Sequence, residues 1–324
     1  MKTILVSGAS GVVGYGTLKS LRASPETYRL LGSSIYSDSV APGFCDEFIQ
    51  ALPTNDDSYI DWLCQTIRDR GIDMIIPGIE ADMIAWNANR EAIEATGVKL
   101  LLNNPDLIAL CADKWSFYER LQQAGAEVAI ESRLQGTYDE LSASYGLPFL
   151  LKPRRGFASK GIVIVDSEQA FKAHAADLGP VVMAQPIVGT NEEEYTVSAF
   201  FDEQSTLLCS MGLRRKLAKE GYTEKAVVDS PAGVEQVMQD LAKFLKPIGP
   251  TNFQFRVQDG KLKLLEINPR ISSATSIRAA FGYNESVMSA AYYLQSKAPV
   301  QPIIKRGYAV RYTEDFIFYD SDSV

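Results

Sequence analysis

The segment of this 324-residue sequence best suited to chemistry is an apolar stretch that ends in polar side chains. Leu264-Leu265-Glu266-Ile267-Asn268-Pro269-Arg270 places a carboxylate, an amide and a guanidinium at alternate positions. Alternate side chains of a β-strand share one face, so Glu266, Asn268 and Arg270 are expected to point the same way. Magnesium prefers oxygen ligands and often shares them with substrate phosphates. We therefore expect Glu266 to bridge two ions and Asn268 to bind one of them.

A third oxygen ligand is expected from the strand before this segment. Gln254 lies between two phenylalanines, and the intervening Asp259-Gly260 is a typical hairpin turn. A hairpin over Thr251–Val257 and Leu262–Ile267 would bring Gln254 to the same face as Glu266. An ordinary hairpin with outward polar residues is the alternative, but it does not explain why Asn-Pro-Arg ends a buried strand.

This hairpin resembles the metal-binding hairpin of ATP-grasp enzymes, and it is closest to the branch of carbamoyl phosphate synthetase and biotin carboxylase. Further motifs follow the order of that family along nearly the whole chain. They are Asp113-Lys114-Trp115 before a helix, Lys152-Pro153 before the loop Arg154–Ile162, Gln185-Pro186-Ile187, Glu194-Tyr195, and Met211-Gly212-x-Arg214. The resemblance implies a single-copy ligase that binds ATP with magnesium, for which manganese is expected to substitute.

The resemblance also implies a role for each matching residue. Lys114 and Lys152 are expected to contact the nucleotide phosphates, with Ser159 and Gly161 in a loop that closes over them. The adenine is expected at Gln185, Pro186 and Ile187, the ribose at Glu194, and the floor of the cleft at Met211 and Arg214. Arg270 and Lys152 are the expected catalytic residues, because their charges would stabilise the transferring phosphoryl group. Gln254 replaces a carboxylate found in many relatives, which predicts weaker metal binding there.

Candidate substrate residues lie next to the expected γ-phosphate. Ser273 and Arg278 follow the metal-binding strand, and Arg215 follows the Met-Gly motif. These side chains are candidates for holding a carboxylate or an acyl phosphate, although a capped helix with one surface arginine fits 271–278 equally well. Glu80 and Asp82 follow a strand at its carboxyl end, where ligands of parallel sheets bind, and either is expected to receive an amine.

The elements that must position these residues fall into two groups. Apolar strands alternate with amphipathic helices over the first hundred residues, which predicts a parallel α/β sheet. The expected strands are Ile4–Ser7, Tyr28–Gly32, Met74–Pro77 and Lys99–Leu102, and the expected helices are Val13–Arg22, Ser58–Arg70 and Ala81–Ala95. Downstream, the expected strands are Phe149–Lys152, Ile162–Val165, Val181–Gln185, Tyr195–Phe201 and Thr206–Met211, and the expected helices are Pro105–Cys111, Lys114–Gln123, Ser167–Ala176 and Val234–Leu245.

The predicted fold is therefore α/β followed by α+β, with a boundary at the Asn103-Asn104-Pro105 turn. A Rossmann-like pre-ATP-grasp domain is expected over residues 1–104, and a two-lobed ATP-grasp domain over residues 105–324. Within the second domain, we expect a lid at about 120–186 and a metal-binding lobe at about 187–310.

One glycine-rich loop suggests a different chemistry. Gly8-Ala9-Ser10-Gly11-Val12-Val13-Gly14 closes a strand and opens a helix, as in nicotinamide-dependent Rossmann oxidoreductases. However, the second strand ends in Gly32-Ser33-Ser34, without an acidic side chain for the ribose hydroxyl. Similar loops also occur in sheets of this kind that bind no nucleotide.

Composition narrows the class of protein. A net charge of −8, with no concentrated basic segment, argues against nucleic acid as a partner. No apolar run reaches membrane-spanning length, and Met1-Lys2 leads directly into a strand rather than a signal peptide. Four scattered cysteines indicate reduced thiols. We expect a cytoplasmic protein without a membrane partner, and a homodimer is left open.

The single histidine, His174, lies on a polar helix face, which argues against histidine-dependent hydrolysis and a typical zinc site.

The predicted function is that of an ATP-dependent, ADP-forming carboxylate–amine ligase with an acyl phosphate intermediate. Its substrates would be a small carboxylate, such as an amino acid, and an amine. The alternatives are phosphorylation of a small carboxylate without amide formation, a nicotinamide-dependent oxidoreductase, and a non-catalytic nucleotide-binding protein. Complete carbamoyl phosphate synthesis is disfavoured, because that resemblance requires two ATP-grasp halves and the chain has one.

Overall fold

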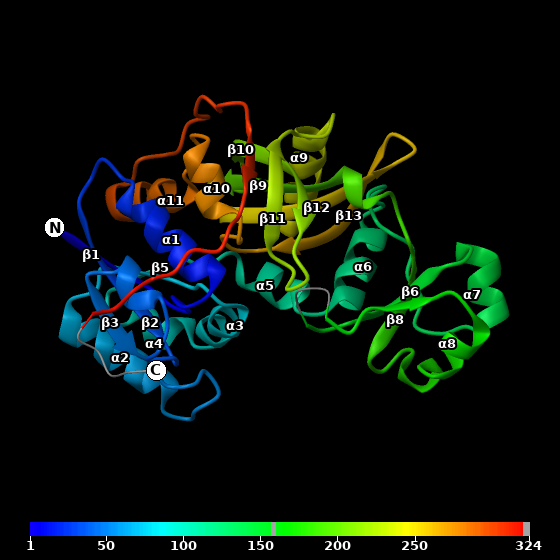
Figure 1. Ribbon diagram of the computed structural model, residues 1–324, viewed down its shortest axis with the longest axis horizontal. Helices are drawn as coiled ribbons and strands as arrows, with labels where there is room; N and C mark the ends of the chain where they lie inside the picture. Colours follow the sequence, from blue (N-terminus) through cyan, green and yellow to red (C-terminus); the bar gives the residue numbers. More distant parts are fainter. Residues whose placement is uncertain (157–159, 320–324) are drawn as a thin grey trace.

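The computed structural model describes residues 1–156 and 160–319, and its architecture rests on three β-sheets (Figure 1). A five-stranded sheet lies at the left of Figure 1, a six-stranded sheet at the centre and a three-stranded sheet at the right. The mixture of one parallel and two antiparallel sheets confirms the predicted fold class.

The five-stranded sheet is parallel, with the strand order β3-β2-β1-β4-β5. Its strands are β1 (Lys2–Val6), β2 (Tyr28–Ser34), β3 (Glu47–Gln50), β4 (Met74–Ile76) and β5 (Lys99–Leu100). The connecting helices are α1 (Val12–Arg22), the 3-10 helix η1 (Ala41–Phe44), α2 (Tyr59–Arg70), α3 (Glu80–Ala88) and α4 (Arg90–Glu94). This sheet matches the prediction, except that β3 was not expected.

Both faces of the parallel sheet are buried, which explains its continuous apolar strands. Leu5 of β1 packs with residues of α2 and α3, while its neighbours Ile4 and Val6 pack on the opposite face with Leu18 of α1. Helix α11 (Glu285–Gln295) contributes Ala290 to that second cluster. The far C-terminal part of the chain therefore completes the core of the N-terminal sheet.

The predicted helix Ala81–Ala95 is wrong in one respect, because the chain leaves the helical conformation at Asn89. This residue has φ −120° and ψ 26° and separates α3 from α4. Its side-chain Nδ2 donates to the Ala85 carbonyl oxygen at 2.9 Å. Asparagine commonly interrupts helices in this way, since its amide competes with the backbone for hydrogen bonds.

The six-stranded sheet is antiparallel, with the order β13-β12-β9-β10-β11-β14. Its strands are β9 (Glu194–Phe201), β10 (Leu207–Leu217), β11 (Thr223–Val228), β12 (Gly249–Gln258), β13 (Lys261–Asn268) and β14 (Tyr308–Val310). Helices α5 (Pro105–Cys111), α6 (Lys114–Gln123) and α9 (Val234–Leu245) share one apolar core with it, and α10 (Thr275–Ala280) follows β13. Strand β10 continues beyond the predicted end at Met211, which places Arg215 within the strand.

The three-stranded sheet has the order β7-β6-β8 and stands apart at the right of Figure 1. It consists of β6 (Phe149–Pro153), β7 (Val163–Val165) and β8 (Val182–Pro186), covered by α7 (Tyr138–Tyr145) and α8 (Glu168–Lys172), with the 3-10 helix η2 (Ala175–Asp177). A second 3-10 helix, η3 (Asn191–Glu193), precedes β9. Helix α7 was not predicted, although Thr137 and Glu140 form a capping box at its start.

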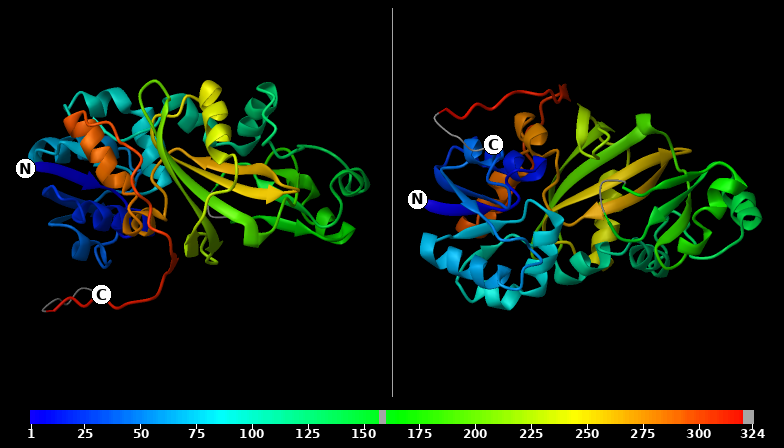
Figure 2. Two further views of the ribbon diagram at one scale, coloured as in Figure 1. Left: turned by 90° about the horizontal axis from the view of Figure 1, so that it is seen from above. Right: turned by 60° about the horizontal axis from the view of Figure 1, so that its bottom comes forward.

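The C-terminal segment returns to the parallel sheet after β14, as both views in Figure 2 show. The Phe316 ring lies 5.9 Å from the Phe44 ring, and a side chain at Gly43 would collide with Phe316. Because α11 and this segment pack on the first sheet, residues 1–104 and 105–324 do not form separate cores. The domain boundaries therefore remain predictions.

A buried polar network supports the centre of the six-stranded sheet. Arg278 is fully buried, and its guanidinium donates to Glu285 Oε1 at 3.0 Å and Asn252 Oδ1 at 2.7 Å. It also donates to Ser272 and Thr196, while Ser198 donates to the second oxygen of Glu285. The network thereby joins α10 and α11 to strands β9 and β12.

Replacing Arg278 should destabilise the fold strongly. Arg278→Met leaves Glu285 buried without its charged partner, which costs about 3–5 kcal/mol of unfolding free energy. Arg214→Met is a matched control, because Arg214 pairs with Asp229 at the surface and such pairs contribute about 1 kcal/mol or less. Urea denaturation of both variants provides the comparison. Equal losses would contradict a structural role for the network.

Candidate active site

A cavity of about 800 Å³ lies between the parallel sheet, the antiparallel sheet and the three-stranded sheet. It is lined by the N-terminal ends of α1 and α3, by α6, and by strands β6, β8, β10, β12 and β13. Most of the predicted site residues line this one cavity: Glu80, Lys114, Lys152, Gln185, Arg215, Gln254, Glu266, Asn268, Arg270 and Ser273.

The proposed metal-binding face is formed by the hairpin of β12 and β13. Gln254 and Glu266 are paired in the register of the two strands, and Asn268 Nδ2 donates to Glu266 Oε1 at 3.1 Å. Burial alone would raise the pKa of Glu266, but the charges of Lys152 and Lys114 outweigh it and hold the pKa below its usual value. Glu266 is therefore an ionised carboxylate inside the cavity at neutral pH.

The hydrogen bonding of Gln254 differs from that expected of a metal ligand. Its Oε1 accepts a hydrogen bond from Arg215 at 2.6 Å, so that oxygen faces a guanidinium. Glu266 and Asn268 are left as the oxygen-bearing pair. Within residues 1–156 and 160–319, no three histidine, cysteine, aspartate or glutamate side chains form a metal-binding group. A cation at Glu266 would therefore need further oxygens from amides or from a phosphate substrate.

Lys152 and Lys114 approach this face from two other elements. Lys152 is buried on β6, and its Nζ donates to the Leu265 carbonyl oxygen at 3.2 Å. Burial lowers the pKa of Lys152 to about 8, although Glu266 partly opposes the shift. Lys114 begins α6, where Asp113 caps the helix by accepting from the backbone N–H of Trp115. The cap orients Lys114, whose Nζ donates to the Gly156 carbonyl oxygen at 2.7 Å.

Glu194 does not line the cavity as expected for a ribose ligand. It is buried, and its two carboxylate oxygens bind Arg215 at 3.1 Å and Arg256 at 2.9 Å. Arg215 does line the cavity, while Glu194 lies behind it. Glu194 therefore holds Arg215 in place, and its contact with a ribose stays a prediction.

Several other predicted residues are not among those that line the cavity, and their roles in binding stay predictions. Arg278 belongs to the buried network, so a surface location is not correct. Met211 packs in a separate apolar cluster, and Arg214 pairs with Asp229. Asp82 is buried and accepts from Thr54 and Tyr59. Pro186, Ile187 and Gly161 are not among the cavity-lining residues, and Ser159 lies outside the described residues.

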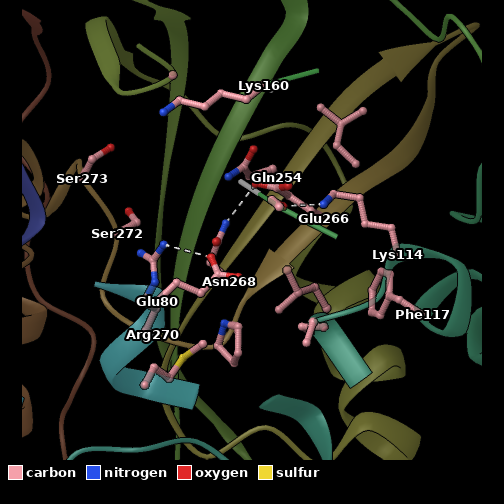
Figure 3. A pocket seen from close by; sticks show the side chains of 18 of the residues that line it. Glu80, Lys114, Phe117, Lys160, Gln254, Glu266, Asn268, Arg270, Ser272 and Ser273 are labelled. Atoms are coloured by element: carbon pink, nitrogen blue, oxygen red, sulfur yellow. Dashed lines mark hydrogen bonds and ion pairs between the residues drawn. The ribbon is translucent and has the colours of Figure 1, made fainter. Parts of the chain in front are cut away.

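The cavity has a distinct order from one end to the other (Figure 3). Lys114 and Phe117 lie on one side, Gln254, Glu266 and Asn268 in the middle, and Arg270, Glu80, Ser272 and Ser273 on the other side. Phe117 shares an apolar cluster with Leu121 and Leu264, and Ile130 and Met183 add further apolar lining to the cavity. These residues were not predicted, because an apolar cavity wall has the same sequence pattern as a core.

Two groups of polar residues near the site were also missed. Arg256 lies two positions after Gln254, so strand alternation already indicated that it shares a face with the metal hairpin. Residues 219–222 form the tip between β10 and β11 and line the cavity. Arg311 holds this tip in place, since its side chain donates to the carbonyl oxygens of Thr223 and Ser273. No local sequence signal indicated Arg311.

The glycine-rich loop serves close chain packing. A Cβ at Gly14 would lie 2.2 Å from the Gly8 carbonyl oxygen, and a Cβ at Gly8 would lie 2.5 Å from Ile79. At the end of β2, Ser10 and Ser34 hydrogen-bond to each other at 2.8 Å, where an oxidoreductase would carry an acid. Close packing alone explains these glycines, and the missing acid at the end of β2 is what weakens the oxidoreductase alternative.

Comparison with known proteins agrees with this geometry. The chain is similar to the N5-carboxyaminoimidazole synthetase of Staphylococcus aureus complexed with ADP, with a TM-score of 0.73, 18% identity, and coverage of 94% of this chain and 80% of that chain. It is also similar to the biotin carboxylase domain of Hydrogenobacter thermophilus 2-oxoglutarate carboxylase, with a TM-score of 0.69, 16% identity, and coverage of 95% and 73%. The fold is that of ATP-grasp proteins.

The sequence comparisons lead to the same group. Residues 182–316 match the family described as ATP-grasp in the biosynthetic pathway with Ter operon. Over 197 residues the chain is 27% identical to the carbamoyl phosphate synthase large chain of Pseudothermotoga lettingae, covering 56% of this chain and 18% of the relative. The corresponding protein of Thermotoga sp. is 23% identical over 320 residues, covering 87% and 28%. The chain belongs to the ATP-grasp superfamily and spans less than a third of these two relatives.

No helix in the described part of the chain is long and apolar enough to cross a membrane.

The wild type should become more stable to unfolding as the pH rises into the alkaline range, and Lys152→Met should lack this increase. The pKa of Lys152 is about 8 in the folded protein and ordinarily 10.5, so between these values the unfolded chain binds more protons. The unfolding free energy of the wild type should therefore rise over this range, by roughly 3 kcal/mol. Urea denaturation at several pH values tests this, with the exposed Lys172→Met as control. A difference between wild type and Lys152→Met that does not change with pH would contradict the shifted pKa.

Proposed function

We propose that the protein is an ATP-dependent carboxylate–amine ligase that forms ADP through an acyl phosphate. The observation that carries this proposal is the order of groups along the cavity of about 800 Å³. From the apolar end to the polar end, the cavity presents three kinds of group. The cations Lys114 and Lys152 suit phosphates, the ionised carboxylate of Glu266 suits a metal, and Arg270 suits a second substrate.

ATP matches this order of groups when its base lies at the apolar end of the cavity and its phosphates point toward the polar end. The apolar walls around Phe117 suit an adenine base, and Lys114 and Lys152 would then lie beside the phosphates as point charges. The γ-phosphate would reach the middle of the cavity, next to Glu266. The carboxylate substrate is left with the end formed by Arg270 and Ser273.

The reaction has two steps that conserve atoms and electrons. A carboxylate oxygen attacks the γ-phosphorus, the bond from phosphorus to the β–γ bridging oxygen breaks, and ADP leaves. The amine nitrogen then attacks the carbonyl carbon, the carbon–oxygen bond to phosphate breaks, and the nitrogen loses a proton. Arg270 and Lys152 would stabilise the charge that develops on the transferring phosphoryl group, so catalysis is mainly positioning and electrostatics.

Magnesium fits the residues present. Glu266 is a partly buried, ionised carboxylate, and Asn268 beside it has an amide oxygen, both of which are suitable ligands for a hard cation. Bound there, magnesium would neutralise phosphate charge during transfer. We propose Glu266 as the main metal ligand, with Asn268 as the second and Gln254 only after Arg215 has released its oxygen.

Nucleotide binding and acyl phosphate formation provide the first test of the proposal. We expect calorimetry to show binding of ATP with magnesium and none of NADH. Mixing a panel of carboxylates with magnesium, ATP and hydroxylamine should release ADP and form a hydroxamate, because hydroxylamine attacks an acyl phosphate. Nucleotide binding without ADP release would favour a non-catalytic protein, and NADH binding without ATP binding would favour an oxidoreductase.

Release of a free acyl phosphate, detected as hydroxamate when hydroxylamine is added only after the protein has been removed, would favour phosphorylation without amide formation.

Glu266→Gln should nearly abolish turnover while preserving the fold. The substitution keeps the shape of the side chain but removes the negative charge that binds the cation, and Asn268 and Gln254 are neutral. We expect at least a hundredfold loss of ADP formation, about 3 kcal/mol in the barrier, with a smaller change in ATP affinity. Glu131→Gln is the matched control, since Glu131 is half-exposed and pairs with Arg133. A variant that retains a tenth of the turnover at saturating magnesium would exclude Glu266 as the metal ligand.

A further inference from the structure

Two opposite charges face each other at the substrate end of the cavity without a hydrogen bond between them. Arg270 NH2 lies 3.9 Å from Glu80 Oε2, drawn as a dashed line in Figure 3. Glu80 begins α3 and its side chain is 26% exposed, while that of Arg270 at the end of β13 is 16% exposed. Charges this sheltered are costly unless they are closely paired.

Both groups keep unused bonding capacity. Arg270 donates to the Ile271 carbonyl oxygen through NH1, but its Nε is buried without a hydrogen-bond partner in the described structure. Within the described residues, Arg270 is the only ion-pair partner recorded for Glu80, and the Glu80 carboxylate accepts no recorded hydrogen bond. Buried polar groups normally find partners, so an unpartnered donor beside an under-partnered acceptor indicates a ligand.

Besides Ser272 and Ser273, apolar side chains also line the cavity near this pair. Ile79 and Ile84 flank Glu80 on either side in the sequence, and both line the cavity although they are 38% and 43% exposed. Val12 and Val13, at the start of α1, line the same cavity. Single exposed isoleucines are ordinary, but several in one cavity wall indicate contact with an apolar part of a ligand.

We propose that the carboxylate substrate is an α-amino acid with an uncharged, mainly apolar side chain, bound as a zwitterion. This inference rests on the ligase function proposed above. The substrate carboxylate binds beside Arg270, its ammonium group binds Glu80, and its side chain lies against Ile79 and Ile84. A zwitterion presents its two charges one carbon apart and so completes both members of the Glu80–Arg270 pair.

This mode of binding assigns the two substrates their roles. An ammonium group held by the Glu80 carboxylate stays protonated, so the bound amino acid has no lone pair with which to attack. It therefore serves as the acyl donor, and a second amine is the nucleophile. A side-chain carboxylate would be repelled by Glu80, and a carboxylic acid without an ammonium group would leave Glu80 without a new partner.

The experiment compares amino acids with acids of the same skeleton that lack the amino group. Leucine is paired with 4-methylpentanoate, valine with 3-methylbutanoate and phenylalanine with 3-phenylpropanoate, and bicarbonate and glutamate are included. Hydroxylamine replaces the unknown amine, and both ADP and hydroxamate are measured. For at least one pair we expect the wild type to have a kcat/KM about 10- to 100-fold higher for the amino acid, the range for one charge-assisted contact.

The decisive variant is Glu80→Gln, with Glu91→Gln as the matched control, since Glu91 is exposed on α4 in the same region. Glu80→Gln should reduce the preference for the amino acid to about threefold or less, mainly through KM, because the ammonium contact is present in both ground and transition states. Its kcat/KM for the deaminated acid should fall by a smaller factor than its kcat/KM for the amino acid. A general structural defect would lower activity with both acids and leave their ratio unchanged.

The outcomes separate this inference from the proposed function. If the wild type uses the deaminated acids, bicarbonate or glutamate as well as the apolar amino acids, or if Glu80→Gln keeps the preference, the amino acid assignment is overturned while the ligase remains. If no acid releases ADP in the presence of magnesium and ATP, the ligase function itself fails.

Discussion

The structure depends on keeping several charged side chains buried in one place. Glu266, Lys152 and Arg215 all lie inside the protein, where an isolated charge costs several kcal/mol. Each is tolerated because oppositely charged or polar groups face it: Glu266 lies near Lys152, and Arg215 lies between Glu194 and Gln254. The register of strands β9, β10, β12 and β13 fixes these pairings, so the antiparallel sheet is both scaffold and electrostatic framework.

Much of this framework could be predicted, because its signals are local. Alternation along β13 identified Glu266, Asn268 and Arg270 as sharing a face, and all three line the cavity. The Asp259-Gly260 turn identified the hairpin that pairs Gln254 with Glu266. The ATP-grasp fold followed from the order of short motifs, and the comparisons confirm it.

The remainder depends on partners far apart in the chain. Glu194 has the residue type and position of a nucleotide ligand, but Arg215 and Arg256, from two other strands, occupy both of its oxygens. Arg278 resembled a substrate or surface residue, yet its partners are supplied by β9, β12 and α11. A sequence shows which side chains can form ion pairs, whereas only the assembled sheet decides which pairs face inward and which face a ligand.

The network around Arg278 also separates what can change in evolution from what cannot. Its members are linked across two helices and two strands, so replacing Arg278 or Glu285 alone leaves a buried charge without its partner. Ile79, Ile84 and Val13 at the cavity wall satisfy no buried polar group, so replacing one of them leaves no buried charge unpaired. Substitutions at the starts of α1 and α3 can therefore reshape the cavity at a smaller cost in stability than substitutions within the network.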